Sequence, residues 1–136
     1  MRNFFILIVI AIIFVACGRK GVMVFYDGER RTPTEVATLE IGNVYLMSID
    51  TLKRRYQAIS EKYIEVLPGQ HMISVNYSSW KGRSTKPISL EFTAESGHKY
   101  LVKARAGYKR WTSWIIDVAL DSLVAGSLEL DDGILM

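Results

Sequence analysis

The sequence has little of what most catalytic and metal-binding sites are built from. It contains one cysteine and two histidines in 136 residues. It has no glycine-rich phosphate loop, no Gly-x-Ser-x-Gly elbow and no paired carboxylates at metal-binding spacing. A single cysteine cannot close a disulfide within the chain, so packing alone must stabilise the folded part. These absences predict a protein that is not an enzyme and that uses no metal or other cofactor.

An excess of charge of one sign is also missing. The 17 lysines and arginines nearly balance the 14 aspartates and glutamates, which leaves a net charge of +3. Domains that bind nucleic acid are usually much more basic, so we expect no nucleic-acid partner. The chain has no internal repeat and no low-complexity tract, and its length fits one domain.

Two short matches to a catalytic motif do not change this interpretation. Ser78 to Lys81 and Ser96 to Lys99 both fit Ser-x-x-Lys, the motif of penicillin-binding proteins. That chemistry requires the serine and the lysine one helical turn apart in a much larger domain. Here both matches fall at the ends of expected strands, so we interpret them as chance matches.

What the sequence does have is an apolar N-terminus. Residues 4–16, FFILIVIAIIFVA, are 13 consecutive apolar residues, and Arg2 precedes them. As a helix this run would be roughly 20 Å long, shorter than the roughly 30 Å core of a bilayer. A basic start, a short apolar segment and a small residue at its end are typical of a secretory signal peptide. We expect residues 1–16 to be that peptide, and an uncleaved signal anchor is the alternative.

The only cysteine, Cys17, follows this run directly. The stretch FVAC resembles the lipobox of bacterial lipoproteins, in which small residues precede a cysteine. The resemblance implies that Cys17 receives a diacylglyceryl group and becomes the first residue of the mature chain. An acylated N-terminus of this kind anchors a protein stably to a membrane. Residues 17–21 would then be a short tether that holds the domain close to the bilayer.

Gly18 bears on which membrane the anchor occupies. In enterobacterial lipoproteins, an aspartate after the acylated cysteine favours retention at the inner membrane. The resemblance therefore implies a lipid-anchored protein of the cell envelope, at the periplasmic face of the outer membrane rather than in the inner membrane.

Alternating apolar and polar residues predict β-strands through most of the mature chain. The segments HMISVNY (71–77), PISLEFTAE (87–95) and HKYLVKARA (98–106) each place every second side chain on one apolar face. Period two with one polar face is typical of antiparallel sheet. Further strands are expected in VMVFY, NVYLMSID, YIEVL and WTSWIIDVAL. The dipeptides Pro68-Gly69 and Ser96-Gly97 predict tight turns between strands.

This pattern predicts the domain organisation. Several short strands separated by turn signals are typical of a β-sandwich, which we place at residues 22–120 with mostly antiparallel pairing. Residues 51–62 fit either a helix or a long loop. Residues 121–136 form a C-terminal tail that either frays or adds one strand.

The strand patterns also carry a resemblance. The segment VLPGQHMISVNY is similar to the turn and strand of PEGA-like domains, small sandwiches of bacterial envelope proteins, although the Pro-Glu-Gly-Ala tetrad is absent. In order, FYDG, EVATLE, MSID, VLPGQHMISVNY and SGHKYLVKA resemble a group of small bacterial lipoproteins, over roughly residues 17–120. The resemblance implies a mainly β, Ig-like or PEGA-like sandwich and an envelope location, and it carries no catalytic residues.

The two histidines are the best candidates for chemistry. His71 and His98 each follow a turn that contains glycine, and in an antiparallel meander both turns lie at the same end of the domain. A shared zinc site needs at least three protein ligands, so a carboxylate such as Asp50 or Glu95 would have to contribute. A buried neutral histidine bonded to backbone at a turn is the more common arrangement, and we favour it. We therefore assign no catalytic and no metal-binding residue.

Two loops combine aromatic and basic residues. WKGRSTK joins two expected strands, and GYKR, followed by a tryptophan, joins the next two. Successive hairpin connections alternate between the ends of a sheet, so both loops are expected at the end opposite the histidines. Aromatic side chains with basic neighbours suit anionic glycans, lipid headgroups or a protein partner, and ordinary solvated loops are the alternative. The predicted contact surface comprises Trp80, Lys81, Arg83, Lys86, Tyr108, Lys109, Arg110 and Trp111.

The sequence thus predicts a membrane-anchored envelope lipoprotein that acts as a non-catalytic binding or structural module. Its expected partners are the membrane, through the lipid on Cys17, and an envelope protein or an anionic glycan or lipid. A small component of a secretion or envelope protein assembly is the alternative. A histidine-dependent enzyme is the third hypothesis.

Overall fold

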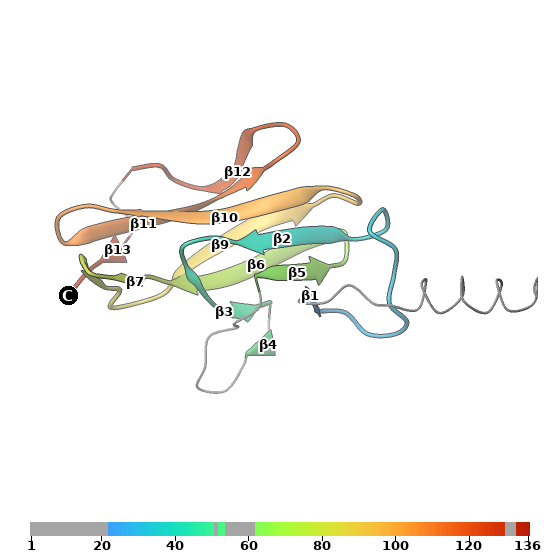
Figure 1. Cartoon of the computed structure of the whole chain (residues 1–136), viewed down its shortest axis with the longest axis horizontal. Coiled ribbons are helices and arrows are strands. Elements are labelled where there is room, and N and C mark those ends of the chain that lie inside the picture. Colours follow the sequence, from blue (N-terminus) through green and yellow to red (C-terminus); the bar gives the residue numbers. More distant parts are fainter. Residues whose placement is uncertain (1–21, 51, 54–61, 130–132) are drawn as a thin grey trace, which may run out of the picture.

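The computed structural model of the chain describes residues 22–50, 52–53, 62–129 and 133–136 (Figure 1). In these residues the chain forms strands and turns, which confirms the mainly β prediction. No helix in them is long and apolar enough to cross a bilayer. The expected signal peptide, Cys17 and the tether lie outside the described residues, as does most of the ambiguous segment 51–62.

Two sheets make up most of the fold. The larger, sheet A, has seven strands. Six of them lie side by side, and the seventh pairs with the fifth strand of that row. In spatial order they are β1 (Val22–Val24), β5 (Tyr63–Val66), β2 (Ala37–Ile41), β10 (Lys99–Ala106), β11 (Arg110–Asp117) and β12 (Ser122–Gly126), with β13 (Gly133–Ile134) also paired to β11.

Sheet B has four strands, all paired antiparallel. Their order in space is β4 (Leu52–Lys53), β3 (Tyr45–Ile49), β6 (Gly69–Asn76) and β9 (Ile88–Ala94). A separate two-stranded hairpin, β7 (Ser78–Ser79) and β8 (Gly82–Arg83), lies between β6 and β9 in the sequence.

Sheet A contains two parallel pairs, which corrects part of the antiparallel prediction. β1 runs parallel to β5, and β2 runs parallel to β10. The cause is that consecutive strands often belong to different sheets: the chain passes from sheet A to sheet B after β2 and after β5, and it returns to sheet A after β4 and after β9. The partners β1 and β5, and likewise β2 and β10, are therefore distant in sequence, and the local pattern of a strand does not fix the direction of such a partner.

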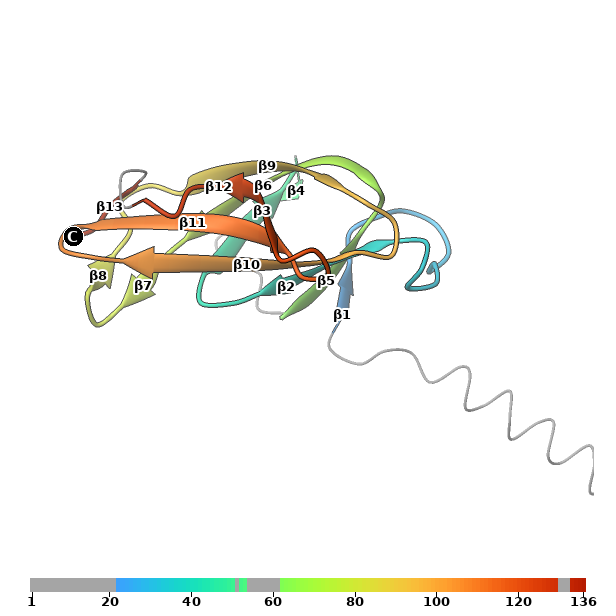
Figure 2. The same cartoon turned by 90° about the horizontal axis from the view of Figure 1, so that it is seen from above.

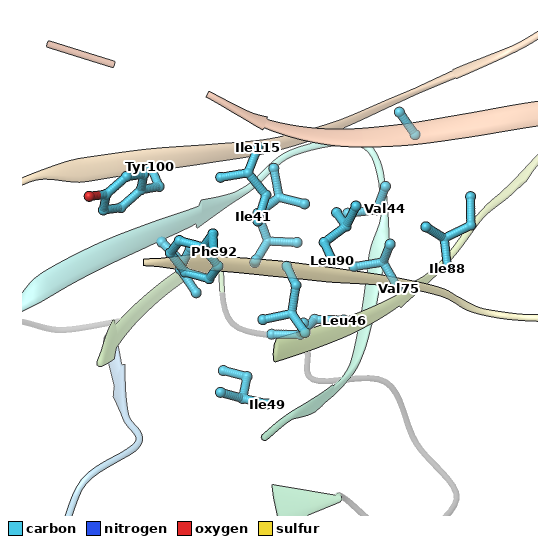
Figure 3. Packing of buried hydrophobic residues seen from close by; sticks show 14 of the residues in the cluster. Ile41, Val44, Leu46, Ile49, Val75, Ile88, Leu90, Phe92, Tyr100 and Ile115 are labelled. Atoms are coloured by element: carbon cyan, nitrogen blue, oxygen red, sulfur yellow. The ribbon is translucent and has the colours of Figure 1, made fainter. Parts of the chain in front are cut away.

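The two sheets share one hydrophobic core. The inward faces predicted from alternation are confirmed: in β9, side chains 88, 90, 92 and 94 are buried and the side chains between them are exposed. Phe92 of sheet B meets Tyr100 of sheet A edge to face, with ring centroids 5.3 Å apart. Figure 3 shows Leu90 and Phe92 reaching from β9 toward Ile115 and Tyr100. Each fully buried side chain of this size contributes about 1.5–3 kcal/mol to folding.

The turns define two opposite ends of the domain. The Pro68-Gly69 turn is confirmed, and Gly69 has a φ of 127°, a conformation that other residues rarely adopt. The register pairs Gly69 with Ala94, so this turn and the Ser96-Gly97 turn lie at one end. The predicted tight turn at Ser96-Gly97 also forms, and it crosses from sheet B to sheet A and so does not close a hairpin within one sheet.

We call the end that carries the Pro68-Gly69 and Ser96-Gly97 turns the histidine end. It is defined by residues 67–71, 95–98 and 118–121. The aromatic-basic end, defined by residues 78–86 and 107–110, lies at the other end of the same strands. The register places it there, because Val75 pairs with Ile88 and Ala106 pairs with Trp111. Figure 2 shows β7, β8 and the β10–β11 turn together on one side of the molecule.

Candidate functional site

The aromatic-basic end is assembled by two hairpins. In the first, β10 turns back into β11, and the N–H of Gly107 donates to the carbonyl oxygen of Arg110 at 2.9 Å. The second is β7–β8, whose strands pair through Ser79 and Gly82. The ammonium group of Lys81 donates to the carbonyl oxygen of Ala106 at 3.2 Å and so joins the two hairpins. The structure therefore brings together the two loops that the sequence predicted would meet.

A hollow of about 570 Å³ lies between these hairpins, and seven residues line it: Trp80, Lys81, Gly107, Tyr108, Lys109, Leu135 and Met136. The exposed fraction is 91% for Trp80 and 88% for Tyr108, far more than a role in the core allows. Each ring carries a lysine ammonium group near its face: Lys81 Nζ is 5.6 Å from the Trp80 centroid, and Lys109 Nζ is 5.3 Å from that of Tyr108. The hollow is thus flanked by two exposed aromatic rings and two cations.

The chain's last residues complete this end, which the sequence did not predict. The backbones of Arg83 and Met136 exchange two hydrogen bonds, both 2.9 Å long. The N–H of Leu135 donates to the carbonyl oxygen of Lys109 at 3.0 Å. Residues 133–136 therefore tie the β7–β8 hairpin to the β10–β11 turn. The short apolar sequence GILM carried no signal for this position, because the partners lie about 25 and 50 residues earlier.

Trp111 must be removed from the predicted contact surface. Its exposed fraction is 0%, and its ring stacks on Tyr77 with centroids 5.7 Å apart. Gly133 lies directly against the indole, where any side chain would collide with it. The alternation within WTSWIID already carried the signal, since Trp111 shares an inward face with Ser113 and Ile115. Trp111 is packed in the core next to this end, so a partner cannot reach it.

The remaining predicted residues stay at the surface. Arg83, Lys86 and Arg110 are exposed, as are both lysines that line the hollow. Neither 78–86 nor 107–110 contains an acidic residue, so this end has five cationic side chains and no acid of its own. Exposed aromatic faces beside cations favour contact with an anionic partner that also offers apolar or planar groups.

The histidine end is organised differently, and its two histidines do not form the shared site considered from the sequence. His71 Nδ1 lies 2.7 Å from Oδ2 of Asp50, and its Nε2 lies 2.6 Å from the carbonyl oxygen of Leu67. The other carboxylate oxygen of Asp50 accepts a hydrogen bond from the N–H of Met72 at 2.9 Å. Both ring nitrogens of His71 are therefore occupied by oxygen acceptors within a local network.

His98 belongs to a second network. Its Nδ1–H donates to Oδ2 of Asp117 at 2.6 Å, and its Nε2 lies 3.3 Å from Oε2 of Glu95. The Asp117 carboxylate is almost fully buried, and its other oxygen accepts the N–H groups of Ala119 and Leu120 at 3.1 and 3.4 Å. This carboxylate thus fixes both the imidazole and the β11–β12 turn.

Charge explains the titration of this network. The hydrogen bond to Asp117 raises the pKa of His98 above its ordinary value of 6.5; burial opposes the shift, and the negative charges of Asp117 and Glu95 reinforce it. Burial acts to raise the pKa of Asp117, but the hydrogen bonds from His98 and from two backbone N–H groups outweigh it, so this pKa lies below its ordinary value. The charged forms of both residues are favoured.

The same network includes three groups that metals commonly use. One donor atom each from Glu95, His98 and Asp117 lies within 4.8 Å of the others. However, the two carboxylates face different nitrogens of one ring, and these nitrogens point in different directions. An ion at Nε2 of His98 would therefore gain only Glu95 as a second protein ligand, whereas zinc sites have three or four. The arrangement is that of an ion-paired network.

Sequence reasoning missed Glu65, which is a second buried carboxylate beside Asp117 among the described residues. It lies in β5 and is fully buried, where the Tyr26 hydroxyl donates to its Oε2 at 3.2 Å and an Arg30 nitrogen is 3.6 Å from its Oε1. These contacts hold the loop after β1 onto sheet A. The only signal was an acid within the apolar strand YIEVL, and nothing in the local pattern named its partners.

No protein-family model, curated protein or solved structure matches the chain.

Proposed function

We propose that this protein is a lipid-anchored, non-catalytic module of the cell envelope that binds an anionic partner through its aromatic-basic end. One observation carries the proposal: two hairpins converge on a hollow whose rim holds Trp80 and Tyr108, nearly fully exposed, together with cations that have no acid in either loop. A fold gains nothing from exposing two large aromatic side chains side by side, whereas binding surfaces are enriched in them.

The fold that we propose for the domain is a β-sandwich of Ig-like or PEGA-like type. Its support is that sheets A and B face one another across a single core, to which both contribute alternating side chains. The resemblance of VLPGQHMISVNY to PEGA-like segments supports it as well, since this segment forms a turn and then β6.

The proposed anchor is a lipid on Cys17. The sequence FVAC supports it, and the first strand begins at Val22, only five residues later. Five extended residues reach roughly 18 Å at most, so the lipid would hold the domain close to the bilayer, at the outer membrane by our proposal. Feeding cells a clickable fatty acid should label the protein, and Cys17→Ser should abolish the label. Equal labelling of both proteins would contradict the anchor.

Binding is tested with the lipid-free chain, residues 18–136, because the lipid itself would insert into vesicles. We expect this chain to bind anionic vesicles or acidic polysaccharide and to leave neutral vesicles unbound. The affinity should fall as salt rises, because exposed charges are screened beyond about 10 Å at 0.1 M salt. Alanine at Lys81, Arg83, Lys109 and Arg110 should remove the binding.

The control variant must lose the same four positive charges at positions outside the two loops. Alanine at Lys62, Lys99, Lys103 and Arg105 removes four cations from β10 and the region before β5 and leaves both loops intact. It should keep most of the binding. Equal loss in both variants would mean that net charge alone drives the interaction, and no binding by the unaltered chain would reject the proposed surface.

The absence of catalysis is part of the proposal. In both histidine networks each ring nitrogen lies within 3.3 Å of an oxygen acceptor, which supports a structural role. Stoichiometric zinc in the purified protein, lost in His98→Gln, would instead favour the histidine-dependent enzyme.

A further inference from the structure

The charges of the chain are divided between two regions. Residues 111–136 contain five acids and neither lysine nor arginine. If cleavage removes residues 1–16, the remaining residues 17–110 contain 16 basic and 9 acidic residues, a net charge of +7 against −5 for the last 26 residues. β11 and β12 carry residues 111–126, which include two of these acids, away from the aromatic-basic end, and residues 133–136 return to it.

The acidic region also carries an exposed apolar surface. The exposed fraction is 47% for Val118, 65% for Leu120, 49% for Leu123 and 36% for Val124. We call residues 118–124 the apolar hairpin, since they form the β11–β12 turn and the start of β12. Asp121 lies exposed within it, with no basic residue nearby in sequence.

Exposed apolar side chains gather at only two places in the described residues. Of 11 large hydrophobic side chains that are exposed there, five lie in residues 118–128 and four, Trp80, Tyr108, Ile134 and Met136, lie at or beside the aromatic-basic end. Only Tyr45 and Met72 lie elsewhere. The aromatic-basic end carries cations and the apolar hairpin carries one exposed acid, Asp121, so the two apolar patches are complementary in charge.

A single chain cannot bring these two surfaces together. β11 begins at Arg110 in the aromatic-basic end and finishes at Asp117, one residue before the apolar hairpin. Its eight residues span about 23 Å, because a strand rises roughly 3.3 Å per residue. Figure 1 shows the β11–β12 turn and the β10–β11 turn at opposite ends of these strands. A contact between these two surfaces would therefore have to join two copies.

We propose that the aromatic-basic end of one copy binds the apolar hairpin of a second copy, head to tail. The inference rests on the proposed function, since it names the anionic partner of that same surface. Trp80 and Tyr108 would cover the apolar side chains of the hairpin, and Lys81 and Lys109 would face Asp121. The two surfaces differ, so the contact is heterologous and each copy keeps one free surface of each kind. Lipid anchors would hold the copies in one plane, and rows of molecules along the membrane result.

Cysteine cross-linking in membranes tests the geometry, because the only native cysteine would be acylated. A chain that carries both Tyr108→Cys and Leu120→Cys should give a ladder of dimers, trimers and larger products on oxidation. Tyr108→Cys alone and Leu120→Cys alone should give little product. A strong dimer from Leu123→Cys alone would overturn the proposal, since it would indicate that two copies pair through the same β12 edge.

The mature protein in detergent tests the two surfaces separately. The end variant carries Lys81→Glu and Lys109→Glu, and the hairpin variant carries Leu120→Ser and Leu123→Ser. Each variant alone should associate roughly tenfold or more weakly than the unaltered protein, and a mixture of both should give dimers but no larger species. The control, Met72→Ser with Lys103→Glu, should associate normally.

The outcome separates this inference from the proposed function. An unaltered protein that stays monomeric at high concentration and low salt, yet binds anionic vesicles, overturns the head-to-tail contact and leaves the binding surface intact. Loss of both properties rejects both proposals.

Discussion

The two ends of the domain both carry charged or titratable side chains but use them in opposite ways. At the histidine end, polar side chains meet side-chain or backbone partners: His71 meets Asp50, and His98 meets Asp117 and Glu95. At the aromatic-basic end, backbone hydrogen bonds tie the segments together, while Trp80 and Tyr108 extend into solvent.

This difference separates groups that stabilise the fold from groups that we propose bind a partner. A buried or half-buried polar side chain must be hydrogen-bonded, because leaving it unpaired costs about 1–3 kcal/mol. The networks of the histidine end meet that requirement and need no ligand to explain them. Exposed aromatic rings have no such explanation in folding, so they point to a contact outside the molecule.

The largest effect is expected at Trp111, which directly follows the aromatic-basic end in sequence but is buried in the core. Trp111→Ala should lower the free energy of unfolding by about 3–5 kcal/mol, because it removes a fully buried ring stacked on Tyr77. Chemical denaturation of both proteins measures this. A change below about 1 kcal/mol would contradict its assignment to the core.

The next largest effect is expected at the histidine end. Asp117→Asn should cost roughly 1–3 kcal/mol of stability, because the charge that binds His98 is lost from a buried position. Asp121→Asn is the matched control, since this residue is exposed in the same turn and asparagine accepts its φ of 49°. The same denaturation measurement should find the control unchanged.

A smaller effect on stability, which depends on pH, is expected at His98. The pKa of His98 is raised in the folded protein, so its protonation stabilises the fold fully below the ordinary value of 6.5. This stabilisation is lost as pH rises through the folded pKa. The difference in melting temperature between the unaltered protein and His98→Gln should therefore shrink from pH 5 to pH 9. A difference that stays constant over this range would contradict the charged network.

The smallest effect on stability is expected for the exposed aromatics. Trp80→Ala and Tyr108→Ala should each change the free energy of unfolding by no more than about 0.5 kcal/mol, because neither ring is buried. Each should nevertheless weaken binding to the partner surface. The same substitution, tryptophan to alanine, is therefore expected to weaken binding at Trp80 and to lower the free energy of unfolding at Trp111. A destabilised Trp80→Ala protein would show that the ring serves the fold.

Much of the fold could be predicted because its signals are local. Alternation placed β6, β9, β10 and β11 close to their observed positions and chose their buried faces correctly. The Pro68-Gly69 turn followed from glycine's freedom at positive φ. The convergence of the two aromatic-basic loops followed from strand direction alone, even though β9 and β10 lie in different sheets, because a crossing turn also reverses the chain.

The candidate site was predicted only in part, for a related reason. Five of its cations and two of its aromatics are where the sequence placed them, but Trp111 is buried and residues 133–136 were not anticipated. Extending the alternation of β11 back to its first residues would have moved Trp111 inward. No local pattern could have brought the chain's last residues beside Arg83, about 50 residues earlier.

Local patterns were therefore enough to predict the strands, their inward faces and the tight turns, because each depends on residues that are close together in the sequence. Only the tertiary structure decided which sheet each strand joins, that β2 runs parallel to β10, and which carboxylate meets each histidine. Asp50 and Asp117 lie 21 and 19 residues from their histidines. Such pairs form because burying a charge without a partner is costly, and packing of the whole domain fixes which partner is within reach.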